Sequence, residues 1–189
     1  MRASDIISRV REHGLVGLSE QDRNAFAYRP GCGRVVRREL VDALLGDHSA
    51  ADLPLLRELM REEITARSEH GGGGRVLFGL ALMLFELANI EDVLLMHSAK
   101  YCNMDAGSML DRRLLTMQRD KLTVRSWIQA RVRQRPSGSI WPVERVLSDV
   151  DAAFAHAAGS GDEDWVRAAW HELHTAYGED LFDEDSEED

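Results

Sequence analysis

The centre of the chain, residues 71–105, reads GGGGRVLFGLALMLFELANIEDVLLMHSAKYCNMD. Between Val76 and Ala88 apolar side chains occur on every side of a helix, and Glu86 is the lone charge. A helix that is apolar all round must be surrounded by neighbours, and this run is far shorter than the roughly 18 to 20 residues that cross a bilayer. The stretch therefore predicts a buried central helix in a fold made of helices, and no membrane span.

The segments on either side of this helix also carry helical patterns. Leu56, Leu59, Met60 and Ile64 recur at helical spacing, and four glycines from Gly71 end that helix, since such a run loses too much backbone entropy to continue it. Nothing in the sequence indicates a strand. Helices are predicted at residues 4–13, 19–26, 34–45, 52–70, 76–88, 90–101, 109–135 with a possible break near 120, 142–158 and 162–177.

We therefore predict an all-α protein of about eight main helices, either an irregular helical bundle or a short HEAT-like stack of αα-hairpins. Its 189 residues suit one domain, which we place at residues 1–178. Residues 179–189 hold eight acidic side chains in eleven positions and cannot bury enough surface to fold alone. This acidic C-terminal tail is predicted to be disordered.

The amino terminus and the cysteines indicate a cytoplasmic protein. Residues 1–10 are charged throughout and lack the apolar region of a signal peptide. Cys32 and Cys102 lie 70 positions apart with no CxxC pairing, which favours free thiols in a reducing compartment.

One part of the chain resembles a known group of proteins. Glu91-Asp92-Val93-Leu94-Leu95, Ala99-Lys100, Asn103-Met104-Asp105, Asp111 and Leu114-Leu115 are similar to a pattern in uncharacterised all-helical bacterial proteins. The resemblance covers roughly residues 77–116. It implies a HEAT-like helical fold and no activity that can be named.

Polar side chains gather where the central apolar stretch ends. Lys100, Asn103, Asp105 and Asp111 surround a helix end and the loop after it. Lysine near a helix C-terminus interacts favourably with the helix dipole, and Asn and Asp cap turns and helices. These four residues are therefore either structural caps, which is the commoner case, or a polar patch that binds a partner.

Two patterns that suggest catalysis or a metal are weak. His97 and Cys102 are five positions apart, about 500° around a helix, so they do not share a face as a nucleophile and its base would. His171-Glu172-Leu173-His174 is one residue short of the HExxH spacing and has no evident third ligand. We predict no catalytic residues, no metal and no cofactor.

A stretch rich in cations follows the central region. Eight basic side chains occur within 24 residues: Arg112, Arg113, Arg119, Lys121, Arg125, Arg131, Arg133 and Arg135. Such density can neutralise phosphates, but residues 144–189 hold 15 acidic side chains against two basic ones and could answer these cations internally. A solvated or internally paired face is the favoured interpretation.

These features predict a non-enzymatic protein-interaction module, an adaptor or an immunity or inhibitor-like protein of bacterial type, with an unknown protein partner. The candidate partner-binding residues are Lys100, Asn103, Asp105, Asp111, Arg112, Arg113 and Arg119. The alternative is a nucleic-acid-binding or regulatory protein that uses the arginine-rich segment 112–135 and is modulated by the acidic tail.

Overall fold

The computed structural model describes residues 2–30, 32–72, 74–133, 142–160 and 165–175. Within these ranges all regular structure is helical apart from an isolated bridge between Arg29 and Cys32, so the all-α prediction is confirmed. The described α-helices are α1 (Ala3–His13), α2 (Glu20–Phe26), α3 (Arg34–Leu45), α4 (Leu53–His70), α5 (Arg75–Glu86), α6 (Val93–Lys100), α7 (Met104–Met109), α8 (Lys121–Arg133), α9 (Val143–Ser160) and α10 (Trp165–Thr175). Four 3-10 turns lie between them: η1 (Leu15–Gly17), η2 (Ala50–Asp52), η3 (Ile90–Asp92) and η4 (Arg112–Thr116).

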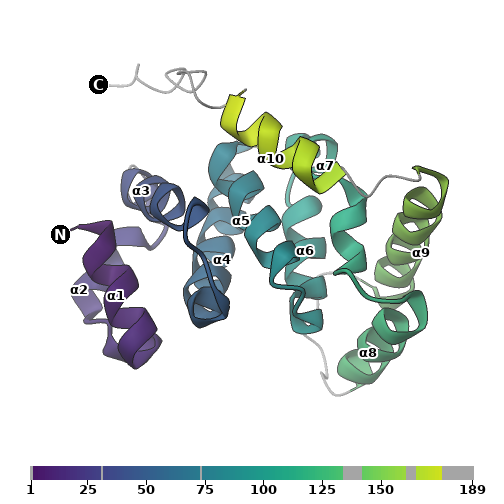
Figure 1. Ribbon diagram of the computed structural model, residues 1–189, viewed down its shortest axis with the longest axis horizontal. Helices are drawn as coiled ribbons and strands as arrows, with labels where there is room; N and C mark the ends of the chain where they lie inside the picture. Colours follow the sequence, from purple (N-terminus) through teal and green to yellow (C-terminus); the bar gives the residue numbers. More distant parts are fainter. Residues whose placement is uncertain (1, 31, 73, 134–141, 161–164, 176–189) are drawn as a thin grey trace.

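Helix α5 is the centre of the fold, as its all-round apolarity predicts. Every residue from Val76 to Phe85 is buried, and α5 packs against α3, α4, α6, α10 and η4. Figure 1 shows α4, α5 and α6 side by side in the middle of the molecule, with α1 to α3 at one end and α8 and α9 at the other. Gly79 permits the close approach of α3, because a Cβ there would lie 3.2 Å from side-chain atoms of both Val41 and Leu45.

Two helix starts are held by the same device. The buried carboxylate of Asp52, where η2 meets α4, accepts hydrogen bonds from Nε and Nη2 of Arg11 at 2.8 and 2.9 Å. The buried carboxylate of Asp92, where η3 meets α6, accepts the equivalent pair from Arg57 at 2.6 and 3.1 Å. In each case a guanidinium from a preceding helix binds both oxygens of the carboxylate, a geometry that fixes orientation as well as distance.

A buried ionic network joins α3 to α4. It extends to Arg67, which lies beside the loop that follows α4 and contains Gly71, Gly72 and Gly74, called the glycine loop below. Glu63 accepts from Nε of Arg37 at 3.0 Å and from Nε of Arg67 at 2.7 Å. Arg37 also donates to the carbonyl oxygen of Phe26 at 3.0 Å. Arg37 and Glu63 are both almost fully buried, so each charge depends on the other for its solvation.

Helix α10 lies across α5 and is fastened by aromatic side chains. Nε1 of Trp170 donates to Glu86 at 2.5 Å, and Glu86 also pairs with His48 at 3.1 Å. The ring of Trp165 packs against Phe85 at a centroid distance of 5.2 Å. Helix α10 thus packs against α5 and shields part of it from solvent (Figure 1).

Two local differences from the predicted helices concern the region after α6. The predicted helix 109–135 is an α-helix only from Lys121, because residues 112–116 form the 3-10 turn η4 and left-handed backbone follows at Met117 and Gln118. The possible break near residue 120 is therefore present, and Asp120 caps α8 by accepting from the amide of Thr123 at 2.9 Å. Residues 104–108, which lie in the loop predicted between helices 90–101 and 109–135, belong to the short helix α7. The predicted tail at 179–189 lies outside the described residues.

Candidate functional site: the junction of α6, α7 and α9

Lys100, at the end of α6, is turned inward. Its side chain is buried, with the residue only 6% exposed. Its ammonium donates to the carbonyl oxygen of Gly107 at 2.7 Å and also to that of Leu110. Lys100 therefore satisfies the carbonyl end of α7 as well as terminating its own helix, and burial, with the nearby Arg112, holds the pKa of its ammonium below the usual range.

Asn103 ties α7 to the far end of α4. Its side-chain oxygen accepts from the amide of Ala106 at 2.8 Å, which caps the start of α7. Its side-chain nitrogen donates to the carbonyl oxygens of Arg67 at 3.0 Å and Gly72 at 2.8 Å. The side-chain amide of Asn103 therefore connects the start of α7 to the glycine loop.

Asp105 binds the same loop from the other side. Its carboxylate accepts from the amide of Gly72 at 2.9 Å. Gly72 has φ of +73°, which favours glycine because a Cβ would be strained there. The structure thus brings the predicted site residues Asn103 and Asp105 together, and both form hydrogen bonds with main-chain groups of Gly72.

Asp111 caps η4 and lies close enough to Lys100 to interact with its charge. Its carboxylate accepts from the amide of Arg113 and from the Arg113 guanidinium, each at 2.7 Å. Burial disfavours the charged form, but the hydrogen bonds from Arg113 prevail and lower the pKa of Asp111. The Arg113 guanidinium lies 4.5 Å from the ring centroid of Trp165, so this predicted contact residue also serves the attachment of α10.

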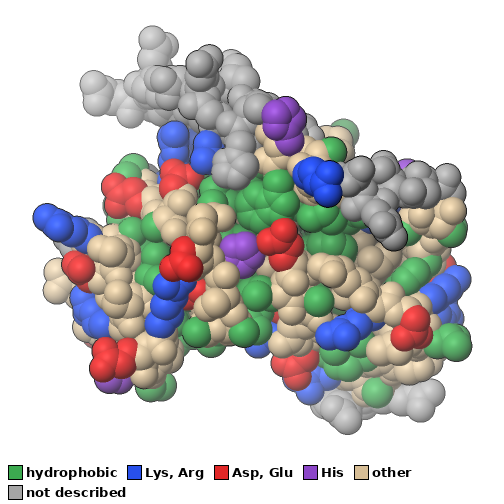
Figure 2. Space-filling model, viewed as in Figure 1, with side chains coloured by type: hydrophobic (Ala, Val, Ile, Leu, Met, Phe, Trp, Pro, Cys, Tyr) green, Lys and Arg blue, Asp and Glu red, His purple; other side chains and the backbone are tan. Residues whose placement is uncertain are grey.

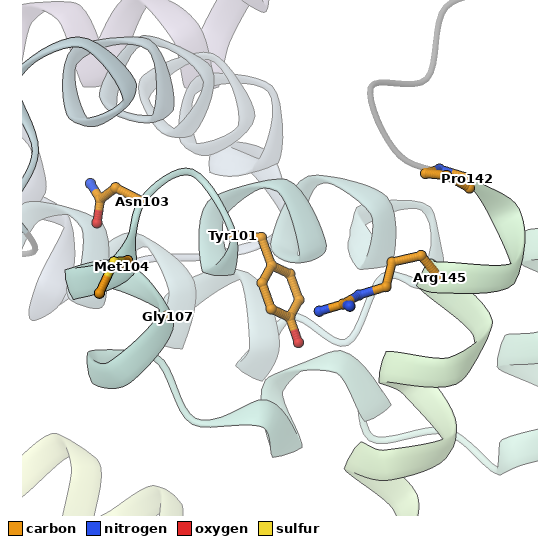
Figure 3. Close-up of a pocket in the computed structure, with 6 residues that line it drawn as sticks. All are labelled: Tyr101, Asn103, Met104, Gly107, Pro142 and Arg145. Atoms are coloured by element: carbon orange, nitrogen blue, oxygen red, sulfur yellow. The ribbon is translucent and has the colours of Figure 1, made fainter.

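A surface hollow opens beside this frame. It has a volume of about 630 Å³ and is lined by Tyr101, Asn103, Met104, Gly107, Pro142 and Arg145, which together define the Tyr101 hollow. Figure 3 shows the ring of Tyr101 between Met104 on α7 and Arg145 on α9. Met104 is 91% exposed, and the Arg145 guanidinium lies 5.6 Å from the centre of the Tyr101 ring.

Behind the hollow, a hydrogen-bonded chain connects α6 with α9. Nε2 of His97 lies 3.0 Å from the carboxylate of Asp149, which also accepts from Nε of Arg145 at 2.9 Å. Burial lowers the pKa of His97 despite the carboxylate beside it. Burial and Asp149 raise the pKa of Tyr101, so both rings are kept neutral near neutral pH.

Sequence reasoning did not select Tyr101, Met104 or Arg145 as site residues. Met104 offers a signal in retrospect, because it is an apolar residue directly after a helix-capping asparagine, where the first turn is usually exposed. Arg145 offers none, since it is 44 positions from Tyr101 and belongs to another helix.

The surroundings of Cys102 and His97 do not activate a nucleophile. Cys102 is half-buried, and burial raises the pKa of its thiol above the ordinary value, which disfavours the reactive thiolate. His97 is directed to Asp149. Of the other candidate pair, His171 is exposed on α10, and the side chain of His174 lies outside what is described. Within the described ranges, no three His, Cys, Asp or Glu side chains gather closely enough to hold a metal ion.

Several basic side chains of the arginine-rich segment form contacts within the protein. Asp151 on α9 pairs with Lys121 at 2.9 Å and with Arg125. Arg119 donates to the carbonyl oxygen of Ala88 at 2.9 Å. Arg112 and Arg131 are exposed, whereas residues 134–141, with Arg135, fall outside the described ranges. Figure 2 shows both signs of charge interspersed on the face that it presents.

In the comparisons with known proteins, no protein-family model, curated protein or solved structure matches the chain. Among the described helices, none combines the length and apolarity that crossing a membrane requires.

Proposed function

We propose that this protein is a non-enzymatic helical interaction module, an adaptor or an immunity or inhibitor-like protein, that binds a protein partner through the Tyr101 hollow in the cytoplasm. The observation that carries the proposal is the composition of the hollow. An exposed methionine, a tyrosine face and an arginine meet there, and Met, Tyr and Arg are enriched at the centres of protein interfaces.

The frame beneath the hollow supports a binding role. Lys100, Asn103 and Asp105 form hydrogen bonds to main-chain groups of α7, α4 and the glycine loop. A surface that is ordered before binding loses less conformational entropy when the partner docks. In this proposal the predicted contact residues Lys100, Asn103 and Asp105 contribute by holding the surface in shape, and Tyr101, Met104 and Arg145 make the contacts.

We also propose that the helices form a short HEAT-like stack. Asp52 and Asp92 are 40 positions apart. Each is the last residue of a 3-10 turn that leads directly into an α-helix, and each is held by an arginine from a preceding helix. A spacing of about 40 residues is typical of HEAT-like repeats. Stacked helical hairpins commonly present extended binding surfaces, which agrees with an interaction role.

Site-specific crosslinking tests the proposed function. A photoreactive benzoylphenylalanine replaces Met104, and a control places it at Leu122, another exposed apolar residue near a helix start, 75% exposed. We expect a discrete crosslinked protein from position 104 in cells and none at position 122. The purified partner should then bind the unmodified protein, and Arg145→Glu should weaken it at least about 10-fold, or about 1.4 kcal/mol. Failure to crosslink at position 104 while the fold is intact would overturn the proposal.

Nucleic-acid binding through residues 112–135 is the less favoured proposal, because Asp151 and backbone carbonyls already engage several of those cations. It is tested by measuring binding to duplex and single-stranded DNA across a salt series, with and without residues 179–189. Phosphate contacts are strongest at low salt, so no binding at low salt by either form would exclude it.

A further inference from the structure

We infer that the partner inserts a short peptide segment in which an apolar side chain is adjacent to a carboxylate, and that Arg145 selects it by its charge. The inference rests on the proposed function, because it assigns a partner chemistry to the same Tyr101 hollow. It is argued from the lining of the hollow, the contacts of Arg145 and the charges around Tyr101.

The lining of the Tyr101 hollow favours an apolar side chain from the partner. Tyr101, Met104 and Pro142 contribute mainly carbon surface, and Gly107 contributes no side chain. The volume of about 630 Å³ is within the usual range of ligand pockets, about 300 to 1,000 Å³. An aromatic or large aliphatic side chain of a partner would remove Met104 and the Tyr101 face from water, which is the favourable term available here.

Arg145 supplies the polar group of the site. It is the single charged residue among the six that line the hollow. Its Nε donates to Asp149 at 2.9 Å, and its guanidinium also hydrogen-bonds the Tyr101 side chain. These two contacts use part of the five N–H donors of a guanidinium. Figure 3 shows the guanidinium end extended toward Tyr101. Its planar group matches a carboxylate, which accepts two hydrogen bonds from it side by side.

The surrounding charges favour an anion over a cation. The Lys100 ammonium lies 5.8 Å from the centre of the Tyr101 ring, on which Arg145 also converges at 5.6 Å. Three carboxylates nearby already accept hydrogen bonds within the protein: Asp149 interacts with His97 and Arg145, Asp111 with Arg113, and Asp105 with the amide of Gly72. A partner lysine or arginine at this position would meet like charges, which is costly at a desolvated contact.

A set of capped dipeptides tests this chemistry directly. The probes are N-acetyl, C-amide dipeptides of phenylalanine followed by glutamate, by glutamine or by lysine. They are titrated into protein with labelled methionine methyl groups, and the Met104 signal is assigned by its loss in Met104→Leu. We expect the glutamate probe to shift this signal with an affinity at least about 5-fold higher than the glutamine probe, and the preference to weaken between about 50 and about 500 mM salt.

Two arginine variants give the matched comparison. Arg145 is 57% exposed and pairs with Asp149 four residues on, and Arg38 on α3 is 55% exposed and pairs with Asp42 four residues on. Because both guanidinium groups are more than half exposed, both Arg145→Gln and Arg38→Gln should fold, which circular dichroism checks. The preference for glutamate over glutamine should vanish in Arg145→Gln and persist in Arg38→Gln.

The outcomes separate this inference from the proposed function. Equal binding of the glutamate and glutamine probes, preference for the lysine probe, or no shift of the Met104 signal by any probe would overturn the inference. A partner crosslinked at position 104 whose binding is unchanged by Arg145→Gln would also overturn it while leaving the interaction role intact. Absence of any crosslinked partner would instead count against the proposed function.

Discussion

Replacing Asn103 by aspartate should destabilise the protein even though aspartate is as good a helix cap as asparagine. The cap at Ala106 uses the side-chain oxygen, which aspartate keeps. The two bonds to Arg67 and Gly72 use the side-chain nitrogen, which aspartate lacks. The variant therefore removes the connection between α7 and α4 while leaving the start of α7 capped.

The magnitude follows from the bonds that are lost. Each hydrogen bond contributes about 0.5 to 1.5 kcal/mol net, so losing both costs about 1 to 3 kcal/mol. The carboxylate would also face the two carbonyl oxygens that Asn103 now satisfies, which raises the total to about 2 to 4 kcal/mol. Asn103→Ser, which retains a cap without this repulsion, should cost about 1 to 3 kcal/mol, and Asn103→Ala about 1 kcal/mol more than serine.

Urea unfolding followed by circular dichroism measures these free energies of unfolding. Asn89→Asp is the matched control, because Asn89 caps η3 by accepting from the amide of Glu91 at 3.0 Å. That variant should lie within about 0.5 kcal/mol of the unmodified protein. If Asn103→Asp is no less stable than Asn89→Asp, the interpretation of Asn103 as a tether is refuted.

Three further measurements address other parts of the fold. Glu63→Leu should cost about 3 to 5 kcal/mol in urea unfolding because it leaves Arg37 buried without its partner, and adding Arg37→Met should recover part of that loss. Because the fold lowers the pKa of His97, the folded state binds its proton less readily than the unfolded state. This contribution to stability should therefore be complete above the unfolded pKa near 6.5 and should decrease as pH falls below that value, by up to about 1.4 kcal/mol per pH unit, with a shallower slope in His97→Gln. Trp170→Phe should cost about 1 kcal/mol by removing the bond to Glu86, and the same loss should be absent when the acceptor has already been removed by Glu86→Ala.

The central helices could be predicted because their signals are local. The all-round apolarity of Val76 to Phe85 required burial, which is what the structure has. The bounds of α3 follow from the breaker at Gly33 and an apolar stripe on one side, and the observed helix, Arg34–Leu45, has the predicted bounds. Helical periodicity reports which face of a segment is buried, and it does so within a single segment.

The candidate site was harder to predict because its parts come from different helices. Helix α7 contains Gly107 and Ser108, which are poor helix formers, and it is held by Lys100, whose ammonium reaches its carbonyl end. The contact of Arg145 with Tyr101 joins α9 to the end of α6, so neither local sequence reveals it. The sequence did indicate that Lys100 and Asn103 lie at a helix end, and in the structure both side chains bind main-chain groups there.

The hydrogen bonds around α7 affect how the sequence of this surface can change during evolution. Lys100 donates to the carbonyl oxygens of Gly107 and Leu110, Asn103 donates to those of Arg67 and Gly72, and Asp105 accepts from a main-chain amide. Since every residue offers the same main-chain groups, these contacts place little restriction on the outward side chains of α7. Such a surface could acquire a new partner through substitutions at exposed positions such as Met104 while the framework that orients them stays the same.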